Sequence, residues 1–305
     1  MEIINLNLNN YKEIRFNTAV ALGNFDGIHI AHKKLILEMV ISGKKSGLKP
    51  SILLFSAHTK QTLEGKSPSV LTSIEQKIEM LKELGVEVIY KIDFDDKLRK
   101  LSPNQFVTEI LINKLNSRLV CVGFDYRFGF KASGDSNLLK NIGKKYGINT
   151  IIIDPIYKDN IISSTRIRKL IEEGKIETAN DMLGYEYSII GKVVDGNKVG
   201  TKLGFPTANL DPITNYIIPK LGIYETNITI GDKTYLGATS IGTNPTFNAD
   251  TLKIENHIID FNDNIYGEMI KVGFIRYLRE EIKFDNIDDL KQQINKDIDN
   301  IISRN

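Results

Sequence analysis

Two histidines placed three residues apart, His29 and His32, are the chain's strongest candidates for phosphate chemistry. They lie in the segment GNFDGIHIAH, between a short apolar run at Thr18–Leu22 and a helix-like pattern that starts near Ile30. A strand, a glycine-bracketed turn and a helix N-terminus would present backbone N–H groups and a positive dipole end to an anion. Residues three apart share a helix face, so both imidazoles could bind a nucleotide phosphate and stabilise charge that grows during its transfer. An isolated histidine pair is more often surface polarity, but the strand and the two glycines favour the phosphate site.

Two further segments carry charged and hydroxyl side chains where an open α/β sheet would place a ligand, at the carboxyl ends of strands. In VGFDYRFG, residues 122–129, Asp125 and Arg127 lie in a turn between two glycines. In ISSTRIR, residues 162–168, hydroxyl groups open a helix that also carries arginines. The hydroxyls are either N-caps or, together with the arginines, a cradle for a triphosphate. The polar residues of this second segment are Ser163, Ser164, Thr165, Arg166 and Arg168.

The length of 305 residues favours two domains, each large enough for its own core. The 41% hydrophobic and 26% charged content is typical of a soluble globular protein, and the formal net charge of +2 gives no field that would select nucleic acid or an anionic membrane. The single cysteine, Cys121, excludes an internal disulfide and is expected to be a buried core residue. No apolar stretch approaches the roughly 18 residues of a spanning helix, and the start lacks the layout of a signal peptide. These features predict a cytoplasmic protein.

Short apolar runs alternate with helical patterns up to residue 183, which predicts a parallel sheet built from βα units. The expected strands lie near residues 18–23, 50–55, 86–92, 118–123 and 148–153. Beyond that point the runs become short, β-rich and separated by turns, which predicts a small antiparallel barrel or sandwich. The tail Asn286–Ile302 has apolar residues at helical spacing and is expected to form one amphipathic helix packed on that barrel. We therefore expect an α/β domain at residues 1–183 and a β domain at residues 184–305.

The N-terminal motifs resemble those of bacterial bifunctional riboflavin kinase/FAD synthetases. The first segment matches the family's Gly-x-Phe-Asp-Gly-x-His-x-Gly-His signature at every position except Ala31. The other two match its Gly-x-Asp-Phe-Arg-Phe-Gly loop, with Tyr126 in place of a phenylalanine, and its Ile-Ser-Ser-Thr-x-Ile-Arg motif. The family's Phe-x-Pro-His-Pro segment appears as Phe55–Thr59 without its two prolines. A methyl group at a close-approach position and a less constrained loop could weaken nucleotide or flavin binding in this half.

This resemblance implies a Rossmann-like nucleotidyltransferase domain in which the phosphate of FMN attacks the α-phosphorus of ATP, pyrophosphate leaves and FAD forms. Such a reaction needs positioning and charge stabilisation but no protein nucleophile. It assigns His29 and His32 to catalysis on the ATP phosphates. Further ATP contacts are expected from Gly23, Phe25, Ser163, Ser164, Thr165, Arg166 and Arg168. The flavin side, or the organisation of the site, is expected to involve Asn24, Asp26, Asp125 and Arg127.

The segment GNKVGTKLGFPTANL, residues 196–210, resembles the riboflavin kinase signature Gly-x-Pro-Thr-Ala-Asn with its upstream glycine loop. A proline-threonine pair alone is an ordinary turn, whereas the full string is far more specific. The glycines would let backbone amides approach a polyphosphate, while Thr207 and Asn209 offer hard oxygen atoms to Mg²⁺. Thr201 stands where the family usually has arginine, with Lys202 next, so the local cation is expected one position later. The expected ATP contacts here are Gly196, Gly200, Lys202, Gly204 and Pro206.

Phosphorylation of riboflavin needs a base for the 5′-hydroxyl of the ribityl chain, and Glu255 is the candidate. It lies in the segment IENHIIDF, which is similar to the family's Glu-x-His strand, and His257 would share its strand face. The alternative is a solvated glutamate on the face of a strand. Contacts with the flavin or its pocket are expected from Asn244, Phe247 and Arg279, with Phe247 either a flavin contact or a core residue.

The favoured function is therefore a bifunctional enzyme that phosphorylates riboflavin with MgATP and then adenylylates FMN. Two alternatives stay open: a riboflavin kinase whose transferase half is weakened or lost, and a flavin-binding regulator that turns nothing over. A base and a histidine pair argue against the regulator, because binding alone needs neither. The expected partners are riboflavin, FMN, ATP and Mg²⁺, with no nucleic acid and no membrane.

Overall fold

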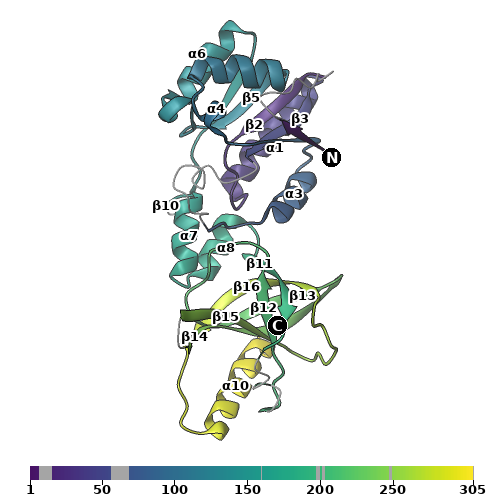
Figure 1. Cartoon of the computed structure of the whole chain (residues 1–305), viewed down its shortest axis with the longest axis vertical. Coiled ribbons are helices and arrows are strands. Elements are labelled where there is room, and N and C mark those ends of the chain that lie inside the picture. The colour runs from purple at the N-terminus through teal and green to yellow at the C-terminus, as the bar shows by residue number, and fades with distance from the viewer. Residues whose placement is uncertain are drawn as a thin grey trace. The chain divides into compact units, whose positions relative to one another are not determined.

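The structure is a computed structural model that describes residues 1–6, 16–55, 69–158, 160–196, 200, 203–246 and 249–304, apart from the side chains of 244–246 and 249–251. The chain divides into two compact units (Figure 1). One comprises Met1–Pro68 and Ile74–Ser163, and the other comprises Ser69–Ser73 and Ser164–Asn305. Three predictions fall outside the described residues: those for Lys202, for Phe247 and for the segment Ser56–Thr59.

A six-stranded parallel sheet forms the centre of the first unit, in the order β1-β4-β3-β2-β5-β8. Its strands are β1 (Glu2–Leu6), β2 (Thr18–Leu22), β3 (Lys49–Phe55), β4 (Val88–Ile92), β5 (Ser117–Gly123) and β8 (Asn149–Ile153). The five predicted strands and the parallel sheet are confirmed. Their continuous apolar runs fit a sheet that is covered on both faces. The sequence did not predict β1, an edge strand in which Ile4 is buried while Ile3 is exposed.

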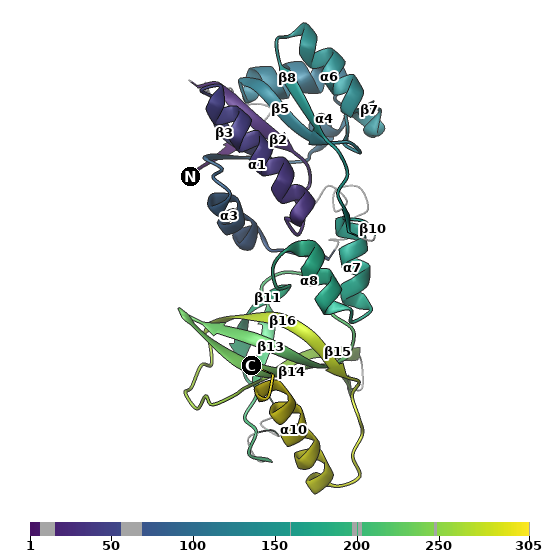
Figure 2. The ribbon, with the colours of Figure 1, turned by 180° about the vertical axis from the view of Figure 1, so that it is seen from behind.

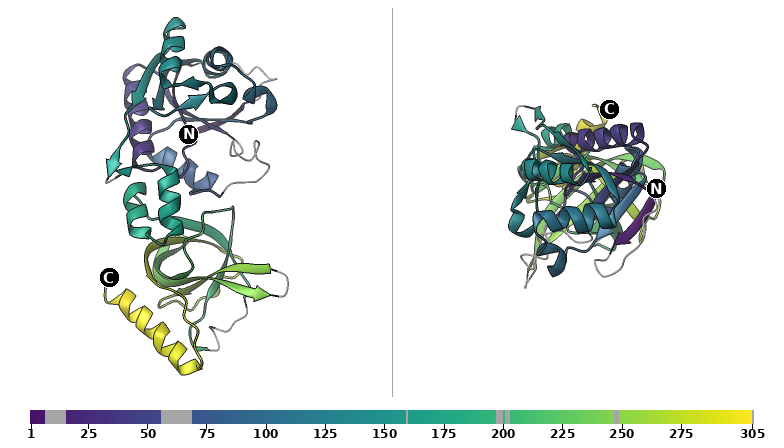
Figure 3. Two further views of the ribbon diagram at one scale, coloured as in Figure 1. Left: turned by 90° about the vertical axis from the view of Figure 1, so that its left-hand side faces the viewer. Right: turned by 90° about the horizontal axis from the view of Figure 1, so that it is seen from above.

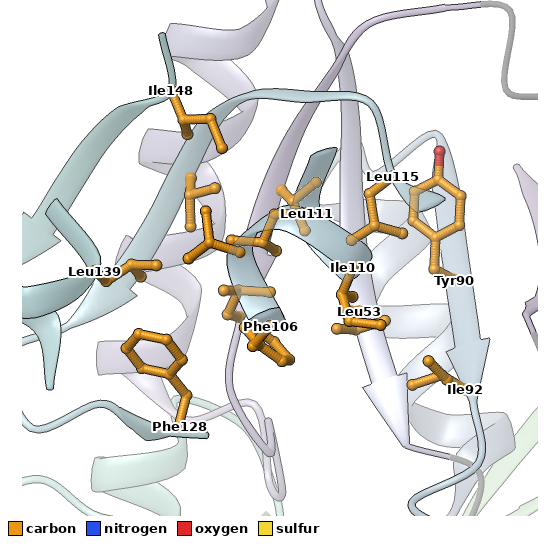
Figure 4. Packing of buried hydrophobic residues seen from close by; sticks show 14 of the residues in the cluster. Leu53, Tyr90, Ile92, Phe106, Ile110, Leu111, Leu115, Phe128, Leu139 and Ile148 are labelled. Atoms are coloured by element: carbon orange, nitrogen blue, oxygen red, sulfur yellow. The ribbon is translucent and has the colours of Figure 1, made fainter. Parts of the chain in front are cut away.

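Helices cover both faces of this sheet, and each face has its own apolar core. The helices are α1 (Ile30–Lys45), α3 (Ile74–Glu83), α4 (Asp96–Arg99), α5 (Pro103–Gln105), the π-helix η1 (Phe106–Lys114), the 3₁₀-helix η2 (Phe130–Ala132) and α6 (Ser136–Lys145). Because side chains alternate along β2, Ala19 and Ala21 pack with α1 and α3, and α1 lies along the sheet in Figure 2. Val20 and Leu22 pack with η1 and α6 on the other face, in the cluster of Figure 4. Cys121 is buried as predicted.

Two short hairpins complete the first unit after the fifth and sixth strands of the sheet. They are formed by β6 (Arg127–Phe128) with β7 (Gly134–Asp135), and by β9 (Tyr157–Lys158) with β10 (Asn160–Ile161). The first hairpin includes Arg127, and Asp125 lies in the turn between β5 and this hairpin.

The second unit is a closed antiparallel barrel, in the order β11-β12-β15-β14-β13-β16 (Figure 3). Its strands are β11 (Ser188–Val194), β12 (Ala208–Pro212), β13 (Gly222–Ile230), β14 (Lys233–Thr246), β15 (Ala249–Ile258) and β16 (Met269–Arg279). The barrel, one of the two β architectures that the short runs allow, is therefore the correct one. Among the described residues it is accompanied by the helices α7 (Ser164–Glu172), α8 (Ile176–Leu183) and α10 (Ile287–Ile302).

The C-terminal helix α10 is confirmed, but it docks through ion pairs as much as through apolar contact. It packs against β14, and Asn286 caps its N-terminus. The guanidinium of Arg279 forks onto Asp297, with Nε 3.0 Å from Oδ1 and Nη2 2.6 Å from Oδ2. Ile301 is fully buried, whereas Ile287, at the other end of the predicted apolar stripe, is 58% exposed. The packing is therefore strongest along the C-terminal half of the helix.

The side chain of one asparagine on helix α8 forms hydrogen bonds to the barrel. Asn180 donates from Nδ2 to the carbonyl of Phe274 at 2.8 Å, and its Oδ1 accepts from the N–H of Tyr187 at 2.7 Å. Both partners are buried strand-end or strand residues. The compact units accordingly divide at Ser163 and Ser164, so α7 and α8 belong with the barrel. The functional boundary at residue 184 stays a prediction.

Candidate active sites

The first candidate site begins where β2 ends, in a turn whose backbone takes several left-handed conformations. Phe25, Gly27 and Ile28 have φ angles of 47°, 81° and 27°. Such dihedrals cost energy in residues other than glycine and persist only when the surroundings hold them. Here the side chains of Phe25 and Ile28 are completely buried in the core beneath α1. Gly23 packs tightly against this turn, because a Cβ there would lie 3.1 Å from the Phe25 ring and would require the ring to shift.

The turn delivers His29 and His32 to the start of α1 as a stacked pair, with ring centroids 3.6 Å apart and planes 14° from parallel. His29 is the N-cap of the helix, and its Nδ1 accepts from the backbone N–H of His32 at 3.3 Å. Because Nδ1 is the acceptor, the neutral ring of His29 carries its proton on Nε2. The edge of His32 meets the Phe25 ring at 5.3 Å, so the buried phenylalanine supports the pair.

Burial keeps both imidazoles of this pair uncharged. Loss of hydration lowers the pKa of His29 from 6.5 to about 4, even though nearby Asp26 acts in the opposite direction. The pKa of His32 lies well below its usual value, again mainly because of burial and then because of His29 and Lys77. Among the described residues, the buried Nδ1 of His32 has no hydrogen-bond partner. A stacked, neutral pair with an open ring nitrogen, in which His29 is buried and His32 half-buried, is typical of a binding or catalytic site.

Lys77 is a site residue that the sequence analysis missed. It lies on α3, and its Nζ is 3.7 Å from Oδ1 of Asp26, a carboxylate only 2% exposed within the histidine turn. This pair fits the predicted role of Asp26 in organising the site. Lys77 belongs to no motif and lies far along the chain from the turn, so no local sequence signal could have found it.

The end of β5 lies beside the end of β2, because the two strands are parallel neighbours. Asp125 and Arg127, which follow β5, are therefore at the same edge of the sheet as the histidine turn, and both are exposed, as is Asn24.

Ser163 is the last residue of the first unit. The predicted helix start is confirmed, since α7 begins at Ser164, and this helix of the second unit also carries Thr165, Arg166 and Arg168. A joint site of these residues with the histidines stays a prediction.

The second candidate site lies on the outer face of the barrel, where Asn209 of β12 is directly opposite Glu255 of β15. Ser240 of β14 flanks Glu255 on the other side. Ile254, Asn256 and Ile258 point into the barrel, so Glu255 and His257 share the outward face, as the alternation of a strand predicts. The Glu255 side chain is 36% exposed and lies 4.0 Å from Nζ of Lys253.

The segment before β12 is held against this face by His257. Its Nδ1 is 2.9 Å from the carbonyl oxygen of Pro206, and its ring meets Phe205 edge-on at 5.7 Å. These contacts fix the chain on both sides of Pro206, immediately before Thr207. The strand-face position of His257 was predicted, but its role as a brace for this segment was not.

The glycine loop folds closely over Asn209. A Cβ at Gly196 would lie only 2.0 Å from Nδ2 of Asn209, and a Cβ at Gly200 would lie 2.3 Å from the carbonyl oxygen of Phe205. Gly204 has a φ angle of 92°, which side chains disfavour. A side chain at Gly196 or Gly200 would therefore meet neighbouring protein atoms, and the approach of these backbone amides to a polyphosphate stays a prediction.

The structure does not show flavin contacts for the two other residues predicted to make them, Arg279 and Asn244. Arg279 is engaged by Asp297 and by the carbonyl of Glu280, so the structure gives it a role in anchoring α10. Asn244 lies on β14, and its side chain is outside the described set. Their flavin contacts stay predictions. Within the described residues, no group of three or more His, Cys, Asp or Glu side chains could hold a metal ion.

Comparison with known proteins assigns both halves of the chain. Residues 11–166 match the family model for FAD synthetase, and residues 183–304 match that for riboflavin kinase. A bifunctional riboflavin kinase/FMN adenylyltransferase from Buchnera aphidicola subsp. Schizaphis graminum is 39% identical over 298 residues, which cover 96% of this chain and 95% of that protein. One of the same name from Listeria monocytogenes is 38% identical over 285 residues, covering 92% and 90%.

A solved structure also shares the fold over nearly the full length. This crystal structure, described as a macrolide-efflux protein from Streptococcus pneumoniae, is 31% identical, with a TM-score of 0.91 over 98% of each chain. In the part of this chain that the structure describes, no helix combines the length and the apolar character needed to cross a membrane.

Proposed function

Because the chain belongs to the family of bifunctional riboflavin kinase/FMN adenylyltransferases, we propose which of its residues carry each reaction. The enzyme phosphorylates riboflavin to FMN and adenylylates FMN to FAD, with ATP as the donor in both steps. Membership over nearly the whole chain favours the bifunctional enzyme over the two alternatives, a riboflavin kinase whose transferase half is weakened or lost and a flavin-binding regulator that turns nothing over. The observation that carries the kinase assignment is the direct pairing of Asn209 with Glu255 across two strands.

In the kinase, Glu255 takes the proton from the 5′-hydroxyl of riboflavin as that oxygen attacks the γ-phosphorus of ATP and ADP leaves. Its partly exposed position on the outer face leaves room for a substrate hydroxyl. The glycines at 196, 200 and 204 let backbone amides approach the ATP phosphates.

Thr207 and Asn209 are the residues that we propose as magnesium ligands. They offer two neutral oxygen donors beside the glycine loop, and Mg²⁺ is commonly held by few protein ligands together with water and substrate phosphates. When bound there, Mg²⁺ would neutralise charge on the ATP phosphates. The brace from His257 to Pro206 keeps Thr207 in place. Lys202 remains our proposal for a nearby phosphate contact.

In the transferase, a phosphate oxygen of FMN attacks the α-phosphorus of ATP, and the bond to pyrophosphate breaks. The Nε2–H of neutral His29 and the ring of His32 bind the phosphates at the N-terminus of α1, where the helix dipole also stabilises negative charge. Asp26 and Lys77 hold the turn. We further propose that Arg166 and Arg168 contact ATP, that Asp125 and Arg127 serve the flavin side, and that both reactions take place in the cytoplasm.

A paired substitution tests this division. The variant Glu255→Gln should lower FMN formation from riboflavin about 10²- to 10⁴-fold, the usual effect of losing a general base, and leave FAD formation from supplied FMN unchanged. The variant His29→Asn keeps an N-cap acceptor but removes the Nε2–H, and should lower only FAD formation. Chromatographic separation of the flavins measures both. A normal kinase rate in Glu255→Gln would show that Glu255 is not the base.

A further inference from the structure

Three polar side chains are enclosed in the otherwise apolar interior of the barrel. Thr226 of β13, Thr239 of β14 and Asn256 of β15 are each fully buried. They lie among apolar residues such as Ile228, Ile241 and Ile254, which are also buried. Burying an amide and two hydroxyls costs free energy unless every group is hydrogen-bonded, and apolar side chains of similar size would avoid that cost.

These three side chains form a hydrogen-bonded chain with a defined direction. Nδ2 of Asn256 is 3.0 Å from the carbonyl oxygen of Ala208, so this atom must be the amide donor. Oδ1 of Asn256 therefore accepts from the hydroxyl of Thr239 at 2.8 Å. That hydroxyl has only one proton, so in its 2.8 Å contact with Thr226 it can only accept, and the proton of Thr226 is shared between this contact and the carbonyl oxygen of Gly237 at 3.1 Å. The order is Thr226 to Thr239 to Asn256 to the backbone of β12.

This series of hydrogen bonds ends at Ala208, next to the proposed magnesium ligands. Ala208 lies between Thr207 and Asn209, the two proposed magnesium ligands, and pairs directly with Asn256. Among the described residues, β12 pairs with β15 over only two positions, Ala208 with Asn256 and Asn209 with Glu255. The hydrogen bond from the Asn256 side chain thus adds a third connection between β12 and β15, on the side of β15 opposite to the Glu255 side chain.

We propose that Asn256 is a positioning residue of the kinase: from inside the barrel it fixes β12 against β15, so that Thr207 and Asn209 present their oxygens opposite Glu255. This proposal rests on the assignment of Thr207, Asn209 and Glu255 given above. Asn256 touches neither substrate nor metal, and it acts only through the carbonyl of Ala208.

The decisive experiment compares Asn256→Leu and Asn256→Asp with wild type across a range of pH. Leucine removes the donor, and kinase turnover should fall by about 10- to 100-fold, as small misplacements of reacting groups do, with a higher Mg²⁺ concentration needed for half-maximal rate. An ionised aspartate has no donor for Ala208, whereas a protonated one can donate to Ala208 and accept from Thr239. Burial raises the pKa of the introduced carboxyl.

The rate of Asn256→Asp relative to wild type should therefore rise as pH falls, while that of Asn256→Leu stays low throughout. Glu255 and His257, the neighbouring titratable groups on β15, are on the outer face and are present in all three proteins, so the ratio to wild type removes their contribution. FAD formation from supplied FMN serves as the internal control, because it belongs to the other unit.

Thr226→Val is the matched control. Thr226 is as deeply buried as Asn256 and lies at the far end of the same hydrogen-bonded chain, and valine has nearly the volume of threonine. It should leave the kinase rate and its Mg²⁺ dependence unchanged even where it lowers the thermal midpoint. If all variants lose kinase activity only in proportion to their thermal midpoints, or if Asn256→Asp shows no recovery at low pH, Asn256 has no positioning role. If Glu255→Gln abolishes the kinase but Asn256→Leu does not, the positioning proposal alone is wrong. A normal kinase in Glu255→Gln would instead overturn the proposed function itself.

Discussion

The two candidate sites differ in where their proposed reactive groups lie. In the first unit the histidine pair at a helix start is uncharged, with His29 buried and His32 half-buried, and Asp26 of the same turn is only 2% exposed. In the barrel, Glu255 lies on an outward strand face with a 36% exposed side chain, and the buried polar groups are on the opposite side of the strand. Adenylyl transfer needs donors held still, whereas phosphorylation of a hydroxyl needs a base that the substrate can reach.

This difference predicts how function and stability are coupled in each unit. Changing a buried group in the histidine turn should disturb the fold and the reaction together, because the same side chains hold the strained turn. On the barrel face, an outward residue can be changed with little effect on folding. The predictions below test this contrast, in order of decreasing effect on the free energy of unfolding.

The largest effect concerns where the barrel unit begins. A fragment 164–305 should be more stable than a fragment 184–305 by on the order of 5 kcal/mol, because the shorter one loses α7 and α8 and leaves the Asn180 partners at Tyr187 and Phe274 unpaired. Urea denaturation of both fragments, with kinase assays, measures this. Both fragments lack Ser69–Ser73, so the comparison is matched. Equal stabilities would support a fold boundary at residue 184.

The second prediction concerns pH and the histidine turn. His29 has a pKa lowered from 6.5 to about 4, so between these values the unfolded chain binds a proton that the native chain does not. The free energy of unfolding should therefore be unaffected above pH 6.5 and fall by about 3 kcal/mol as pH drops towards 4. Denaturation of wild type and His29→Asn at each pH isolates this contribution, because asparagine caps the helix without titrating. Parallel pH profiles would contradict it.

Much of both sites could be predicted because short-range rules determine them. The apolar runs gave the strands, and parallel neighbours place the ends of β2 and β5 at one edge. Period-two alternation correctly placed Glu255 and His257 on one face. Lys77 could not be found, because its contact with Asp26 depends on how α3 packs on the sheet. Asn256 could have been noticed from one weak feature of the sequence. It is a polar residue between Ile254 and Ile258, at positions that strand alternation assigns to the barrel interior.

Similar limits apply where long-range packing decides a residue's role. Arg279 belongs to a segment that resembles the family, yet its fork onto Asp297 depends on where α10 docks, which no local pattern specifies. The apolar spacing of α10 predicted the helix, but not that Ile287 would extend into solvent while Ile301 is buried.

The third prediction concerns Lys77, which the sequence analysis did not identify. Lys77→Met should lower the free energy of unfolding by about 2 kcal/mol, because it removes a cation 3.7 Å from the buried carboxylate of Asp26. FAD formation should fall as well, since Asp26 lies in the turn that carries the histidines, while the kinase rate should be unchanged. The double variant Asp26→Asn/Lys77→Met also removes the buried negative charge and should recover part of the stability. A stable Lys77→Met with normal FAD synthesis would show that the pair plays no part in the site.

The smallest effect is expected at Ala31, the one mismatch in the most specific motif. Ala31 is the second residue of α1, and it is not among the described residues with positive φ, so its conformation suits alanine as well as glycine. Ala31→Gly should therefore lose up to about 1 kcal/mol of stability, the usual difference between the two residues inside a helix. Both reaction rates should stay the same. If FAD formation became faster while the kinase rate held, the methyl group of Ala31 would be blocking close approach of the nucleotide, and the histidine turn would be sterically limited in a way that the barrel site is not.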